Sequence, residues 1–330
     1  MPHSCFTPLA LAGVIAATLV ASAPAYAWDS LTVFGDSLSD GGNVGRFTYD
    51  GAQHPLYDEI LAADSGLSLR PSSQGGNNYA QGGAVTVPAL NPAFNTQDQL
   101  ARWLQRNNGR AERNGLYIYW AGANDIAAAV LANPLTAPQT VAASASAAAA
   151  QVRTLLDAGA GTVIVPNVPQ LGTTPLMIET VLQLTGPLAD SALQAAFQSL
   201  NATPVLSQAA REQAIQTAFS RAAGEVSAIP AVRDALAQQL FALWQVLSEQ
   251  VTALSDGFNQ QEEAGLAALK GNIVRADIAG LLSEVIADPA RYGLSNTIGM
   301  ACPPGTSAAQ CTSATPGFSE AQRFLFADRL

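Results

Sequence analysis

The residues best suited to chemistry lie near the start of the chain, where an apolar run leads into Gly35-Asp36-Ser37. The run from Leu31 to Phe34 predicts a short buried strand, and Gly35 permits a sharp turn at its end. Ser37 then lies at the carboxyl end of the strand, where open α/β sheets carry their active sites. We therefore regard Ser37 as a candidate nucleophile, the alternative being an ordinary turn serine.

A serine hydroxyl is a weak nucleophile that needs a nearby base and hydrogen-bond donors for the oxyanion. Three further motifs follow Ser37 along the chain: NNYAQGGA, which ends at Ala84, GAND at Gly122–Asp125 and PNVPQLGTTP at Pro166–Pro175. In this order the four segments resemble the GDSL, or SGNH, family of serine esterases and lipases. The similarity is greatest to its secreted branch, which includes autotransporter esterase passenger domains, and it runs from about Trp28 to Leu330.

The resemblance implies a role for each matching residue. Ser37 is the nucleophile and supplies the first oxyanion donor through its backbone N–H, Gly83 supplies the second, and the Asn124 side chain supplies the third. Gly82 is the rival for the second donor; Gly83 is preferred because of its spacing from Asn78. The alternative for Asn124 is a loop amide that caps the following helix.

The triad acid is expected at Asp328, in the family's last motif, Asp-x-x-His. The sequence ends Asp328-Arg329-Leu330, one residue before that histidine, so we expect an incomplete site with severely impaired turnover. His54 precedes Pro55 at the start of the first expected helix and is not expected to serve as the base. No cofactor and no metal are expected, since the sequence contains no H-E-x-x-H or paired-cysteine ligand set.

Strand and helix patterns alternate through the first half of the chain. Helices are expected at Pro55–Ala63, Gln97–Arg106 and Ala137–Ala158, and strands at Leu116–Trp120 and Thr162–Val168. Residues 77–87 are expected to form a strand that runs into a loop at Gly82-Gly83. Alternating strands and helices predict parallel pairing. We expect a three-layer α/β/α fold with a doubly wound, flavodoxin-like parallel sheet.

A long helical insertion is expected over residues 179–269. Its clearest part is an apolar stripe from Val232 to Leu254, which reads either as a lid or acyl-chain shelf, or simply as core. With no repeat and no linker in view, residues 28–330 are assigned to one hydrolase domain that is incomplete at its C-terminus.

Composition narrows the class of protein. The chain has 330 residues, 48% of them hydrophobic and 12% charged, and a formal net charge of −10. Because its basic residues are few and scattered, we expect no nucleic-acid partner. Residues 1–27 are expected to be a signal peptide cleaved after Ala27, with a buried helix as the alternative, so the protein is expected to be secreted, periplasmic or on the cell surface.

Of the three cysteines, Cys5 belongs to the expected signal peptide. Cys302 and Cys311 flank a Pro-Pro-Gly loop and are expected to pair as a structural disulfide. The resulting expectation is a secreted carboxylic-ester hydrolase that acts on small-molecule or lipid esters through a Ser37 acyl-enzyme. Alternatives are an acyltransferase, a carbohydrate acetylesterase, or a catalytically dead ester-binding fragment. The resemblance also implies a membrane β-barrel translocator as a partner, encoded outside these residues.

Overall fold

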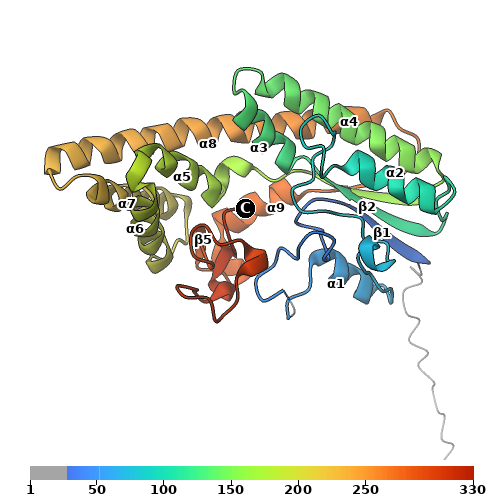
Figure 1. Ribbon diagram of the computed structural model, residues 1–330, viewed down its shortest axis with the longest axis horizontal. Helices are drawn as coiled ribbons and strands as arrows, with labels where there is room; N and C mark the ends of the chain where they lie inside the picture. The colour runs from blue at the N-terminus through green and yellow to red at the C-terminus, as the bar shows by residue number, and fades with distance from the viewer. Residues whose placement is uncertain (1–27, 52) are drawn as a thin grey trace, which may run out of the picture.

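The computed structural model describes residues 28–51 and 53–330, so the expected signal peptide lies outside the described residues. A parallel four-stranded sheet, in the order β1-β2-β3-β4, lies between helices (Figure 1). Its strands are β1 (Ser30–Gly35), β2 (Gly115–Trp120), β3 (Thr162–Pro166) and β4 (Asn272–Ala276). A second, two-stranded parallel sheet pairs β5 (Asn296–Met300) with β6 (Phe324–Phe326).

Side chains alternate between the two faces of the main sheet along each strand, and both faces of β1, β2 and β3 are buried. Phe34, Tyr117 and Val163 contribute to the larger apolar cluster, with α2 (Thr96–Arg106), α4 (Ala137–Asp157) and α8 (Pro230–Ala267). Leu31 and Ile118 face the other way, toward α1 (Tyr57–Asp64). Helices therefore cover both faces, and the three-layer α/β/α prediction is confirmed.

The segment around Asn78 is a fifth, very short parallel partner, at the outer edge of β1. Val33 N donates to Asn77 O at 3.0 Å, and Tyr79 N donates to Val33 O at 2.7 Å. From β1 the chain thus continues first to one side and then, through β2, to the other, which makes the β1 end a topological switch point. As expected, this segment then runs into a loop, because a turn in which Ala84 N donates to Gln81 O at 3.0 Å ends the pairing.

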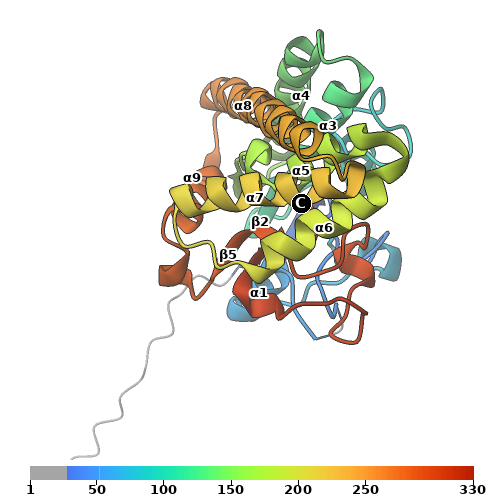
Figure 2. The ribbon, with the colours of Figure 1, turned by 90° about the vertical axis from the view of Figure 1, so that its left-hand side faces the viewer.

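Four helices occupy the chain between β3 and β4: α5 (Pro175–Leu182), α6 (Ala189–Ala202), α7 (Gln208–Val226) and α8. Figure 2 shows α6, α7 and α8 side by side, and in Figure 1 they extend well beyond the sheet. The part of the chain that the structure describes contains no helix with the length and hydropathy needed to cross a bilayer.

The apolar stripe expected along α8 is partly wrong. Within the stripe, Val232 and Leu243 are 50% and 41% exposed, whereas Leu240 and Val251 are buried. The difference arises because α4 and α7 cover different stretches of this 38-residue helix, so that no straight line of residues is buried along all of it. The remaining helices are α3 (Ala123–Ala132), which follows β2, and α9 (Ile278–Ala287), which follows β4.

Candidate active site

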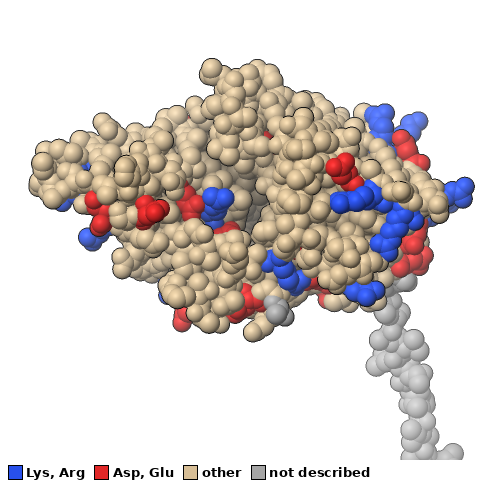
Figure 3. All heavy atoms as spheres, in the orientation of Figure 1, with Lys and Arg blue, Asp and Glu red and all other residues tan. Residues whose placement is uncertain are grey.

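A cavity of about 330 Å³ lies beyond the carboxyl ends of β1 and β2. Ser37, Gly83, Asn124 and Asp328 all line it, although they come from four distant parts of the sequence. We call α6, α7 and α8 the helical lobe. In Figure 3 the surface is hollowed where Figure 1 marks the end of the chain, between the helical lobe and the sheet. The structure therefore brings the four predicted site residues to one place.

The end of β1 holds Ser37 in a fixed position. Gly35 N donates to the Gln99 side-chain oxygen at 3.0 Å, and the Gln99 amide donates back to Gly35 O at 2.8 Å. A Cβ on Gly35 would lie 2.4 Å from Trp120 O, so a glycine is required there. The half-buried Ser37 hydroxyl lines the cavity and has no hydrogen-bond partner within the described ranges.

Hydrogen bonds to Asp40 connect the loop that follows Ser37 to the Gly82-Gly83 pair. Its buried carboxylate accepts hydrogen bonds from four successive backbone N–H groups of residues 42–45 and from Gly82 N at 2.8 Å. The N–H of Gly83, by contrast, has no acceptor in residues 28–51 and 53–330. Gly83 has φ +76°, a left-handed conformation, and a Cβ there would meet nothing within 4 Å.

Two asparagines hold the neighbouring loops together. The Asn43 amide donates to Asn78 O and Ala80 O, both at 2.8 Å, and the Asn78 amide donates to Ser39 O at 2.6 Å. Asn78 also donates to the buried Asp58 at 3.0 Å. The polar groups that follow β1 are thus fixed by side chains from two loops.

Asn124 lies in the first turn of α3. Its amide nitrogen donates to Ala84 O at 3.0 Å, which leaves the second N–H of that nitrogen for another acceptor. The alternative of a helix cap is wrong, because the N-cap residue of α3 is Gly122. The adjacent Asp125 is buried and accepts hydrogen bonds from Thr86 N at 3.0 Å and Thr86 Oγ1 at 2.6 Å, so α3 also holds the glycine loop.

Asp36, next to the nucleophile candidate in the chain, is buried and does not line the cavity. Its carboxylate accepts a hydrogen bond from Leu38 N at 3.1 Å, which stabilises the turn. Burial raises the pKa of Asp36 to about 7, and the nearby charge of Asp125 acts in the same direction. Burial likewise raises the pKa of Asp125.

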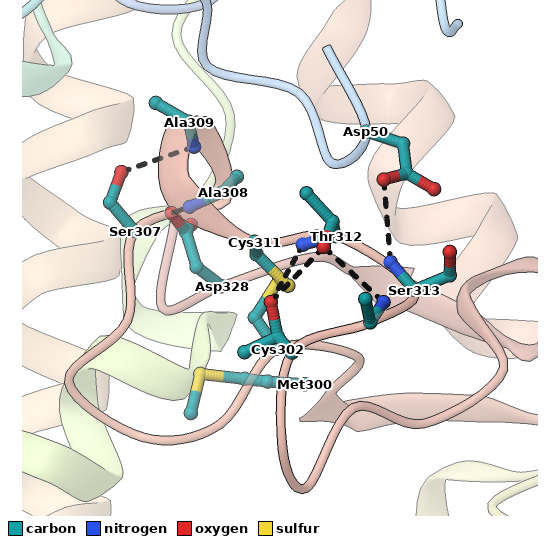
Figure 4. Close-up of a disulfide and its surroundings, with 12 residues drawn as sticks. Asp50, Met300, Cys302, Ser307, Ala308, Ala309, Cys311, Thr312, Ser313 and Asp328 are labelled. Carbon is teal, nitrogen blue, oxygen red and sulfur yellow. Dashed lines mark hydrogen bonds between the residues drawn. A yellow bond between two sulfur atoms is a disulfide. The ribbon is translucent and has the colours of Figure 1, made fainter.

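The two-stranded sheet of β5 and β6 positions Asp328 at the cavity. Its pairing continues past β5 and β6, where Cys302 N donates to Ala327 O at 2.8 Å. Cys302 and Cys311 form a disulfide with an S–S distance of 2.11 Å, and the loop that it closes supplies Ala308 N, which donates to Asp328 Oδ2 at 2.7 Å (Figure 4). Asp328 Oδ1 accepts a hydrogen bond from Leu330 N at 3.2 Å.

Glu179, a second carboxyl in this cavity, is a residue that was not expected from the sequence. Glu179 is 7% exposed, lies in α5 and forms an ion pair with Arg329 at 3.7 Å. Burial raises its pKa, Arg329 opposes that shift, and Asp328 adds to it. The main chain reinforces the contact, since Leu176 N donates to Arg329 O at 3.0 Å. A lone acid in the apolar helix PLMIETVL was the available signal.

His54 is not among the residues that line the cavity; its ring stacks on Tyr49 at a centroid distance of 4.3 Å. Within the described residues, no group of three or more His, Cys, Asp or Glu side chains is placed to hold a metal ion.

Comparison with known proteins gives concordant matches. The family model "GDSL-like Lipase/Acylhydrolase" matches residues 31–308. The chain is 43% identical over 320 residues to "Lipase 1" of Photorhabdus luminescens, an alignment covering 96% of this chain and 49% of that protein. It is also 30% identical over 201 residues to an "Uncharacterized protein in trpE-trpG intergenic region" of Pseudomonas putida, covering 52% of this chain and 33% of that protein. The chain therefore spans about half the length of the first relative and a third of the second. With its Ser37 loop and parallel sheet, the chain belongs to the GDSL-like lipase/acylhydrolase family.

Proposed function

We propose that this chain hydrolyses carboxylic esters through an acyl-enzyme formed on Ser37. One observation carries the proposal: a single cavity is lined by the Ser37 hydroxyl, by Gly83 with its unengaged N–H and by the Asn124 amide. Membership in the lipase/acylhydrolase family supports the same class of reaction.

The reaction begins when Ser37 Oγ attacks the ester carbonyl carbon. The negative charge that develops on the carbonyl oxygen is received by the N–H groups of Ser37 and Gly83 and by the free N–H of the Asn124 amide. Gly82 is unsuited to this role because its N–H already donates to Asp40. The base takes the proton of Ser37 Oγ and gives it to the alcohol as it leaves, and water then hydrolyses the acyl-enzyme to release the acid and restore Ser37.

The base in this proposal is the histidine of the family's Asp-x-x-His motif, three residues after Asp328 and so directly after Leu330. Asp328 would hold the ring in the correct tautomer and stabilise its protonated form. What supports Asp328 as the acid is its place in the cavity wall, where two backbone N–H groups orient its carboxylate.

Export from the cytoplasm is part of the proposal. The Ala25-Tyr26-Ala27 site and the Cys302–Cys311 bond support it, since disulfides persist in oxidising compartments. The resemblance to autotransporter passenger domains is what supports a translocator as a partner.

The test is active-site labelling with an organophosphonate, using residues 28–330 extended by the histidine motif. Mass spectrometry should find one adduct, on the peptide that contains Ser37, and Ser37→Ala should abolish both the adduct and ester hydrolysis. Ser39→Ala is the matched control, because the Ser39 hydroxyl bonds to Tyr57 at 2.8 Å and does not line the cavity. Hydrolysis that persists in Ser37→Ala would show that another residue is the nucleophile.

A further inference from the structure

A second cavity, of about 410 Å³, lies in the helical lobe and shares none of the residues that line the first. Its wall is formed by the 3₁₀ turn Leu171–Thr173, the first turns of α7 and the middle of α8. The mechanism proposed above uses none of these residues. The cavity is large enough for a small organic ligand rather than a single water molecule.

Three hydrogen-bond donors on this wall lack acceptors. Arg211 Nε, Trp244 Nε1 and Ser248 Oγ are buried atoms without a hydrogen-bond partner among the described residues. Arg211 is 3% exposed and Trp244 is 7% exposed. Buried polar groups in folded proteins are nearly always paired, so three unpaired donors around one cavity indicate a missing acceptor.

The charge of Arg211 also indicates that a negatively charged acceptor is missing. Its guanidinium donates to the Thr173 carbonyl, but no carboxylate of the described residues forms an ion pair with it. Burial lowers the pKa of Arg211 to about 10, and the charge of Glu212 opposes this shift. A buried cation is normally matched by an anion, and a guanidinium matches a carboxylate especially well.

Acidic side chains also line this cavity. Glu212 and Glu249 are exposed, and Asp256 is partly buried. They disfavour a ligand that carries only negative charge and favour one with a cationic group directed toward them.

We propose that this cavity is a binding site for a small zwitterion with one carboxylate and one amine. The carboxylate accepts hydrogen bonds from Arg211, Trp244 and Ser248 once these side chains turn their covered donor atoms into the cavity, and the amine faces Glu212, Glu249 and Asp256. The site is separate from ester hydrolysis and is testable whether or not the proposed function holds.

The experiment is isothermal titration calorimetry of the full chain with 4-aminobutyrate, acetate and inorganic phosphate at matched ionic strength. 4-Aminobutyrate should bind once per chain, acetate at least about tenfold more weakly, and phosphate more weakly still. Arg211→Met should abolish binding of 4-aminobutyrate. Ser248→Ala and Trp244→Phe, which each remove one donor, should weaken it about tenfold.

Arg221→Met is the matched control, because Arg221 lies on the same helix, is exposed and does not line the cavity. Its affinity should equal that of the unaltered chain. The proposal is overturned if none of the three probes binds, or if phosphate or acetate binds as tightly as 4-aminobutyrate. Unaltered affinity in Arg211→Met overturns it as well. Should Arg211→Met fail to fold, unaltered affinity in both Ser248→Ala and Trp244→Phe has the same meaning.

Discussion

The backbone N–H of Gly82 donates to the Asp40 carboxylate at 2.8 Å, across a separation of 42 residues. This bond engages one glycine of the Gly82-Gly83 pair and leaves the N–H of the other without a protein acceptor among the described residues. The same carboxylate organises the loop that follows Ser37. Asp40 therefore fixes the nucleophile candidate relative to the candidate oxyanion donor.

The first prediction concerns Asp40 itself. Asp40→Ala should lower the free energy of unfolding by about 3 kcal/mol, because several backbone N–H groups lose their acceptor together. Urea unfolding measures the loss, and Asp157→Ala, at an exposed aspartate at the end of α4, should stay within about 0.5 kcal/mol of the unaltered chain. Equal unfolding midpoints for the two variants would show that Asp40 does not hold the loops.

Much of this site could be predicted from local sequence. Ser37, Gly83 and Asn124 each lie in a short motif beside a recognisable strand or turn, and the family fixes their order. Gln99 could not be found in this way, since it contacts Gly35 across 64 residues and a glutamine in a polar helix is usually exposed.

In the fold, too, some elements could be predicted from their own residues, whereas others depend on contacts with distant parts of the chain. The strands at β2 and β3 were predictable because they are continuous apolar runs, as buried parallel strands usually are. The exposed Val232 and Leu243 were not, since the burial of a position on α8 depends on which helix crosses it. The paired strands β5 and β6 also escaped prediction, because pairing across a disulfide loop leaves no periodic pattern.

The second prediction tests the proposed oxyanion donor. Asn124→Ala should lower turnover by about 10² to 10³, as the loss of one such donor typically does, with little effect on KM. The measurement is steady-state hydrolysis of a short-chain aryl ester by the form that carries the histidine motif. Asn133→Ala, at the opposite end of α3, is the control and should leave turnover unchanged. A loss of less than fivefold in Asn124→Ala would contradict its role.

The third prediction concerns stability and pH. Burial raises the pKa of Asp36, Asp58 and Glu262 to about 7. Unfolded carboxyls titrate near pH 4, so between about pH 4 and pH 7 the folded chain binds more protons than the unfolded chain. The free energy of unfolding should therefore fall as pH rises through this range, by up to about 1.4 kcal/mol per pH unit for each group.

Urea unfolding at pH 5, 6 and 7 measures this slope. Asp58→Asn should make it shallower, because the amide does not ionise. Asp64→Asn, at the exposed end of the same helix, is the control and should preserve the slope. A free energy of unfolding that rises from pH 5 to pH 7 would contradict the buried-carboxyl argument.

The fourth prediction concerns the disulfide. Replacing Cys302 and Cys311 by serine should lower the free energy of unfolding by about 2 to 3 kcal/mol, since the bond closes a loop with a sequence separation of 9. Turnover should fall too, because that loop carries Ala308, which orients Asp328. The same change should follow when dithiothreitol reduces the unaltered chain. If the variant shows an unchanged urea midpoint, the disulfide has no stabilising role.

The last prediction concerns the base. Residues 28–330 should fold yet hydrolyse esters slowly, because Ser37 lacks a histidine partner. Adding His-Pro-Thr and a following helix after Leu330 should restore rapid hydrolysis of a short-chain aryl ester and labelling by an organophosphonate. Even without a triad member, a site can retain a rate about 10³ to 10⁴ above that in water, so weak turnover in the shorter form fits the prediction.

Two further variants separate the possible bases. In the extended form, replacing the added histidine by alanine should return the rate to that of residues 28–330, whereas His54→Ala should leave it unchanged. Equal and rapid turnover with and without the extension would contradict a triad of Ser37, Asp328 and the added histidine. In that case His54→Ala becomes decisive, because His54 is the only histidine in residues 28–330 of the sequence. Its ring would then have to leave Tyr49 and reach a cavity that it does not line in this structure.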